Sequence, residues 1–121
     1  MTGLPRREIN APSTDMRNLK WSAAEKAIAR KAFDLALRRE LEVVIREAKD
    51  RAAGIEQPSD LWELESYLTH RRKEIDRKYD YRYSILPLVF GSLLREGRLS
   101  EQELDGLGED KLAYIRQFAL H

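Results

Sequence analysis

The chain has 121 residues, of which 36% are charged and 8% aromatic, with no cysteine and a formal net charge of +1 at pH 7. This length fits one domain, and the balance of charge gives no general attraction to nucleic acid or anionic lipid. Without cysteine, disulfides, thiolate catalysis and cysteine-bound metals are excluded, and we expect a cytoplasmic protein.

Residues 1–20 combine prolines and charged residues with little periodicity, as at Pro5, Arg6, Arg7 and Pro12. This composition predicts a flexible N-terminal arm. The segment lacks the apolar core of a secretory signal. No apolar run anywhere in the sequence approaches the ~20 residues of a membrane span, so we expect no membrane association.

The first long helix is predicted over residues 22–53. Ser22 and Glu25 have the spacing of a capping box, and Trp21 is placed to pack against the first turn. Strong helix formers then follow without proline or glycine until Gly54. Such a helix is a rod of roughly 46 Å, which is long for a domain of this size.

Two apolar stripes run along this predicted rod, more than one short partner helix can cover. An exposed apolar surface of this extent is typical of an interface, so we expect a homodimer with isologous contacts along the rod. The alternative is a monomeric bundle in which both stripes are internal. The residues expected at the dimer seam are Phe33, Leu37, Leu41, Val44 and Ala48.

A second long helix is predicted over residues 60–81, with Asp60 as its cap and Glu63 completing a capping box. Pro58 ends any preceding helix, and the short connection favours an antiparallel return over the first helix. Two guanidiniums, Arg71 and Arg72, interrupt its apolar stripe. That stripe is formed by Leu61, Leu64, Leu68, Ile75 and Tyr79.

The aromatic alternation at Tyr79, Tyr81 and Tyr83 is typical of a strand, but the sequence offers no second strand to pair with it. We therefore expect helix again from Ile85 to about Glu96, nearly apolar all round and hence buried. Pro87 is tolerated in its first turn, and Gly97 ends it in the left-handed conformation.

A capping box at Ser100 and Glu103 predicts a short helix to about Leu107, followed by a last helix that begins near Glu109. The expected fold is therefore all-α. A long helical rod and a second long helix are followed by a small helical head over residues 84–121, so that 21–121 form one helical domain.

The sequence shows no catalytic constellation. His70 and His121 are the only histidines, and no phosphate-binding loop or metal-ligand spacing is present. The carboxylates of the second helix alternate with arginines and lysines at helical spacing, which favours ion pairs over acid–base catalysis. We expect a protein that is not an enzyme and carries no metal or cofactor.

A nucleic-acid site is an alternative for the end of the second helix. Aromatic rings beside cations can stack on bases and neutralise phosphates. A packed helix junction is the more typical use of such residues, so we expect no nucleic-acid partner. The residues concerned are Arg77, Lys78, Tyr81 and Arg82.

The stretch from Asp60-Leu61-Trp62 through Glu74-Ile75-Asp76 to Tyr79-Asp80-x-Arg82 resembles the fluorescence recovery protein family. The likeness continues in Val89-Phe90 and Glu96-Gly97, and weakly upstream at Trp21-Ser22 and Arg39-Glu40-Leu41. It covers roughly residues 21 to 120.

The resemblance implies a non-enzymatic regulator of photoprotection. Members bind the C-terminal domain of the photoactivated orange carotenoid protein and accelerate its return to the dark state. The family's tryptophan and arginine on the partner-binding or dimer-forming surface match Trp62 and Arg72, and its acid matches Asp76. Glu65 and Ser66 stand where cyanobacterial members typically carry His-Asp, and a basic position after the tryptophan reads Glu63. These departures leave open an alternative, a helical dimeric adaptor with a different partner in a non-cyanobacterial host.

Overall fold

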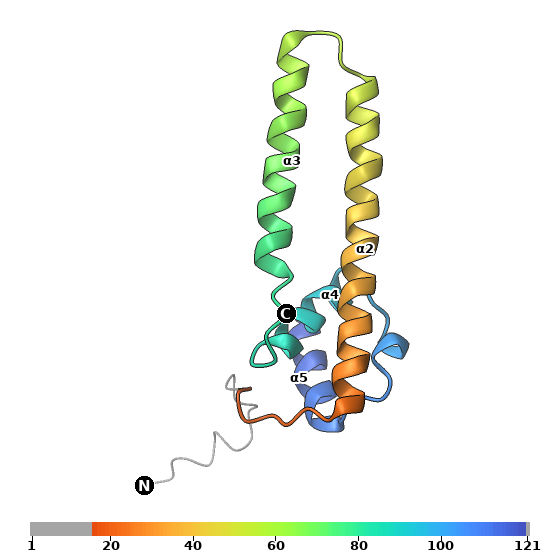
Figure 1. Ribbon diagram of the computed structural model, residues 1–121, viewed down its shortest axis with the longest axis vertical. Helices are drawn as coiled ribbons and strands as arrows, with labels where there is room; N and C mark the ends of the chain where they lie inside the picture. Colours follow the sequence, from red (N-terminus) through yellow and green to blue (C-terminus); the bar gives the residue numbers. More distant parts are fainter. Residues whose placement is uncertain (1–15, 121) are drawn as a thin grey trace, which may run out of the picture.

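The computed structural model describes residues 16–120, and within that range it contains helices and no strand. Two long helices form an antiparallel hairpin, and the shorter helices gather around one end of it (Figure 1). The all-α prediction is confirmed. The elements are α2 (Ala23–Ala53), α3 (Pro58–Lys78), α4 (Leu86–Arg95), the 3-10 helix η1 (Glu101–Leu104) and α5 (Glu109–Ala119).

The start of α2 follows the predicted capping box. The Ser22 hydroxyl accepts a hydrogen bond from the Glu25 backbone N–H at 3.1 Å, and the Ser22 N–H donates to the Glu25 carboxylate at 2.9 Å. These bonds satisfy two groups that a helix end otherwise leaves unpaired.

The predicted start of α3 is wrong by two residues. The helix begins at Pro58, because a proline is accommodated in the first turn, where its missing N–H is not needed. Asp60 is therefore inside the helix and is not its cap. Its carboxylate accepts hydrogen bonds from the backbone N–H groups of Glu56 and Gln57, at 2.9 and 3.0 Å.

The predicted end of α3 at residue 81 is also wrong, since the helix ends at Lys78. Beyond it, the rings of Tyr79 and Tyr81 pack edge-on against Phe33, with centroids 5.5 and 4.9 Å apart. Burial of these rings in the head outweighs continuation of the helix. The prediction that Gly97 ends α4 in the left-handed region is confirmed by its φ of 77°.

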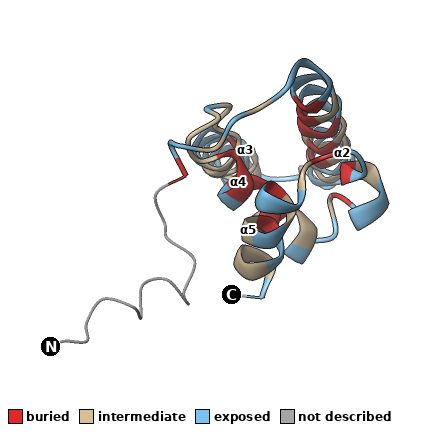
Figure 2. Cartoon of the chain, turned by 90° about the horizontal axis from the view of Figure 1, so that it is seen from below, coloured by how far each residue is buried: buried red, intermediate tan, exposed pale blue. Residues whose placement is uncertain are grey.

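The hydrophobic core lies in the head, where the first half of α2 meets α4, η1 and α5. Figure 2 shows buried segments on α2, α4 and α5. The largest fully buried apolar side chains include Phe90, Leu86, Leu93, Leu104 and Ile115. The head thus includes the N-terminal half of α2 as well as the segment after residue 84.

The distal half of the hairpin buries almost nothing within the chain. Every buried residue of α2 lies at or before Glu40, and α3 has a single one, Ile75. The apolar stripe predicted for α3 is instead partly open, with Leu61 49% and Leu68 40% exposed. Residues 16–120 therefore leave the apolar surface of the distal hairpin uncovered.

Residues 1–15, and with them most of the predicted arm, lie outside the described residues. Residues 16–20 are described. Met16 is buried, and the Lys20 carbonyl accepts a hydrogen bond from the Lys111 ammonium. No helix in the range 16–120 has the length and apolar character needed to cross a membrane.

Candidate functional site: the hairpin groove and its surroundings

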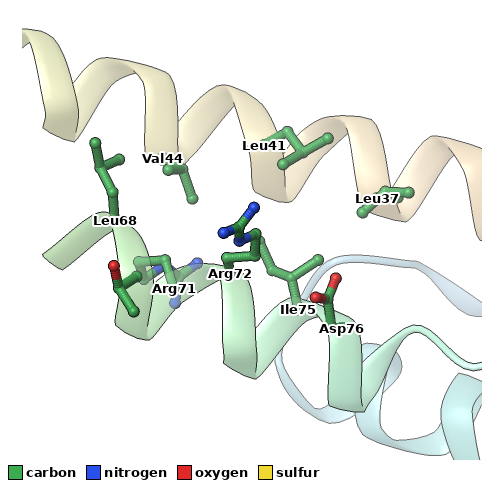
Figure 3. Close-up of a pocket in the computed structure, with 9 residues that line it drawn as sticks. Leu37, Leu41, Val44, Leu68, Arg71, Arg72, Ile75 and Asp76 are labelled. Carbon is green, nitrogen blue, oxygen red and sulfur yellow. The ribbon is translucent and has the colours of Figure 1, made fainter. Parts of the chain in front are cut away.

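A groove of about 550 Å³ lies between α2 and α3 in the uncovered part of the hairpin (Figure 3). Its walls combine apolar side chains from both helices with a small polar set from α3. Three of the predicted seam residues, Leu37, Leu41 and Val44, belong to it. The remaining lining residues are Leu68, Thr69, Arg71, Arg72, Ile75 and Asp76.

Two neighbouring arginines of the groove have opposite environments. The Arg71 side chain is 19% exposed and donates hydrogen bonds to Glu40 and Glu74, at 2.8 and 2.9 Å. Arg72 is exposed and makes no hydrogen bond or ion pair with any residue in the described range. Arg72 therefore keeps all its donors for a partner, and a guanidinium beside apolar walls suits a carboxylate.

Glu40 of α2 is a buried carboxylate, 1% exposed, next to the groove. Lys78 Nζ lies 2.8 Å from its Oε1, and the Tyr79 hydroxyl donates to the same oxygen at 2.8 Å. Arg71 donates to Oε2 at 2.8 Å, and Arg98 Nε lies 3.5 Å from Oε1. We name these five residues the Glu40 cluster.

The charges of the Glu40 cluster keep its carboxylate ionised. Burial opposes ionisation, but the hydrogen bonds from Lys78 and Tyr79 and the charge of Arg98 outweigh it, so the pKa of Glu40 lies below its usual range. Burial and the bond to Glu40 raise the pKa of the Tyr79 phenol. The sequence alone does not reveal this cluster, because Glu40 has charged neighbours on both sides and its partners are 31 or more residues away.

Trp62 is 65% exposed on the outer part of α3. It borders a shallow hollow with Ser66 and Tyr67, and the Arg51 guanidinium lies 4.3 Å from the Tyr67 ring centre. Glu65 is exposed and borders a neighbouring hollow, again with Ser66.

The predicted partner surface is thus divided between two places on α3. Arg72 and Asp76 lie in the groove, and Trp62, Glu65 and Ser66 lie in hollows outside it. The structure does not bring these five residues into one cavity. All of them are exposed.

The predicted seam needs one correction, at Phe33. This residue is only 5% exposed and belongs to the core of its own head, where it contacts Tyr79 and Tyr81. The sequence groups Phe33 with Leu37, because the apolar stripe of α2 continues from one to the other. Ala48 is half-buried on the distal part of α2.

The residues of the nucleic-acid alternative do not form a free basic surface. Lys78 is held by Glu40 and Glu96, Tyr81 packs on the core, and Arg82 is paired with Asp80 at 2.6 Å. Only Arg77 of the four is exposed without such a bond among the described residues. No group of three or more metal-ligating side chains is found in the range 16–120 either.

Comparison with known proteins identifies the family. The family model of the photoprotection regulator fluorescence recovery protein matches residues 21–119. This chain belongs to that family. It is 40% identical to the fluorescence recovery protein of Synechocystis over 99 residues, which are 82% of this chain and 91% of that protein. The predicted resemblance is confirmed.

Solved structures of the family have the same fold as this chain. The fluorescence recovery protein of Fremyella diplosiphon superposes with a TM-score of 0.80 at 40% identity, covering 84% of this chain and all of that one. The Synechocystis protein gives the same TM-score and coverage at 39% identity. Residues 1–20 precede the matched region.

Proposed function

We propose that this protein is a non-enzymatic regulator that binds the photoactivated orange carotenoid protein and accelerates its return to the dark state. Membership of the photoprotection regulator family over residues 21–119 carries this proposal. Such a regulator works by binding one state of its partner more tightly than the other, or by stabilising the transition state between the two.

We propose α3 as the partner-binding element, with Trp62 and Arg72 as its main contacts. Trp62 is a large exposed aromatic, and Arg72 is an exposed arginine without an ion pair among the described residues; tryptophan and arginine most often dominate binding energy. Glu65 and Ser66 border the Trp62 hollow, and Asp76 lies in the groove with Arg72, so these three residues would tune charge around the two anchors.

We further propose that the protein acts as a homodimer formed along the hairpin. The support is the apolar groove, together with the lack of buried residues on α2 beyond Glu40. The expected seam consists of Leu37, Leu41, Val44 and Ala48. A cytoplasmic location fits a chain without cysteine and is part of this proposal.

The test is the dark recovery rate of a photoactivated orange carotenoid protein, measured over a concentration series of this protein. We expect clear acceleration by the wild type. For Trp62→Ala and Arg72→Ala, the half-saturating concentration should rise by about 5- to 30-fold, as for interface anchors.

The matched control is Lys49→Ala, which truncates an exposed residue of α2 outside the groove. It should accelerate recovery like the wild type, and circular dichroism should show equal helix content in all four proteins. No acceleration and no co-elution of the wild type with the carotenoid protein would contradict the proposal and favour the alternative of a different partner.

A further inference from the structure

Apolar packing positions α2 but leaves α3 weakly held. Every buried residue of α2 lies at or before Glu40, where the helix belongs to the head. In α3, by contrast, Ile75 is the single buried residue in 21. After Lys78 the chain is not helical until α4, and the rings of Tyr79 and Tyr81 hold only this C-terminal end of α3 against the head.

Glu40 lies where the head ends and the hairpin groove begins, and it connects three separate segments. Its carboxylate receives Arg71 and Lys78 from α3, Tyr79 from the segment after it, and Arg98 from the segment after α4. The Tyr79 hydroxyl also lies 3.1 Å from the Ala36 carbonyl oxygen of α2. Arg71 in addition lines the groove, so the cluster contributes directly to its wall.

We propose that Glu40 is a positioning residue that sets the separation of α3 from α2, and with it the width of the hairpin groove. The biological use of that width depends on the function proposed above, whereas the positioning itself does not. A buried charge with several hydrogen-bonded partners is a directional contact, which suits this task where apolar packing is sparse.

Loss of the carboxylate charge should release α3. Arg71, Lys78 and Arg98 would then surround a neutral side chain, and their mutual repulsion would favour separation of the segments that carry them. Glu74 and Glu96 remain to pair with Arg71 and Lys78 at the edge of the cluster, which keeps the chain folded.

The experiment is a distance measurement between two spin labels. Because the chain has no cysteine, labels can be attached at Arg38→Cys on α2 and Lys73→Cys on α3, both exposed positions. The labelled protein is diluted with unlabelled protein, so that each labelled chain is measured alone. We expect one narrow distance distribution in the wild-type background and a wider or shifted one in Glu40→Gln.

The matched control is Glu103→Gln, which removes a different ion pair, between Arg39 of α2 and Glu103 of η1, without touching α3. It should leave the distribution narrow. An unchanged distribution in folded Glu40→Gln, or equal broadening in Glu103→Gln, overturns the proposal.

Tyr79→Phe serves as a milder second variant. It removes one donor to Glu40 and leaves all charges in place, so a smaller broadening is expected. If Glu40→Gln fails to fold, Tyr79→Phe decides the question, and an unchanged distribution then overturns the proposal. No carotenoid protein is present in the measurement, so its failure is distinguishable from failure of the proposed function.

Discussion

Arg39 of α2 and Glu103 of η1 form a two-pronged ion pair, with guanidinium nitrogens 2.8 and 2.6 Å from the two carboxylate oxygens. The hydrogen bonds from Arg39, together with the Ser100 backbone N–H, lower the pKa of Glu103 to about 2. The pKa of Glu25 is lowered to about 2 as well, first by the Ser22 backbone N–H and further by Gly108 and Lys111. Two links between α2 and the segment after residue 84 therefore depend on ionised carboxylates.

The first prediction concerns acid stability. Both folded-state pKa values, about 2, lie below the ordinary value of 4.5. Between about pH 2 and pH 4.5 the unfolded chain therefore binds more protons than the folded chain. The stabilisation is complete above about pH 4.5 and is lost as the pH falls towards 2. Urea unfolding at pH 7, 4 and 2.5 should show this decline. The fall in unfolding free energy with pH should be smaller in Glu25→Gln and Glu103→Gln than in the wild type. An equal fall in all three proteins would contradict the assignment of this acid sensitivity to Glu25 and Glu103.

The second prediction concerns the contact of α4 with α5. A Cβ at Gly91 would lie 2.5 Å from Phe118 Cβ and 2.9 Å from the Ile115 carbonyl oxygen, so Gly91→Ala must push the helices apart. We expect a loss of about 1–3 kcal/mol in the free energy of unfolding, the usual range for overpacking. Gly54→Ala is the matched control, since its Cβ would be 3.7 Å from its nearest neighbours. Equal thermal stability of the two variants would show that this packing is not limiting.

The third prediction concerns the seam. Leu41 is 41% exposed in the groove, and Leu41→Glu would place a charge in the proposed dimer contact. Light scattering coupled to size-exclusion chromatography should then give the mass of one chain where the wild type gives two. Arg46→Glu changes charge on the far side of α2, about 140° from Leu41, and should stay dimeric. A dimeric Leu41→Glu variant would locate the interface elsewhere.

The fourth prediction concerns charge beside Trp62. The resemblance implies that Glu63 stands where the family often carries a basic residue, so Glu63→Lys should speed association with a cyanobacterial carotenoid protein by about 2- to 10-fold at low salt. The gain should disappear at high salt, because rim charges act through screened fields. Glu42→Lys reverses an exposed charge on α2 and is the control. A gain of equal size in both variants would indicate a global charge effect.

Local signals predicted the start of α2, the start of η1 and the end of α4, but not the start of α3, which begins at Pro58 and not at Asp60. The capping boxes at Ser22 and Ser100 and the left-handed Gly97 depend only on neighbours within four residues, and all three are present. The end of α3 was missed because the burial of Tyr79 and Tyr81 against Phe33 is decided by residues more than 40 positions away. No local pattern carries that information.

The sequence predicted that the candidate site lies on a helix, but it did not show which side chains of that helix are available to a partner. Trp62 and Arg72 are predicted from the resemblance, and both are exposed. Arg71 and Arg72 are adjacent and alike in sequence, yet Arg71 donates a hydrogen bond to Glu40, whereas Arg72 has no such partner within residues 16–120. The distinction depends on tertiary structure, since only the fold brings residue 40 next to residue 71.

The end of burial at Glu40 divides a single continuous helix into two parts of unequal stability. Up to Glu40, opening α2 requires disruption of the core, so backbone amides there should exchange with deuterium only through global unfolding. Beyond Glu40, the amides of the distal hairpin can open by local fluctuation. If a second chain covers that surface, their protection becomes linked to protein concentration, and dilution would release the hairpin while the head stays closed.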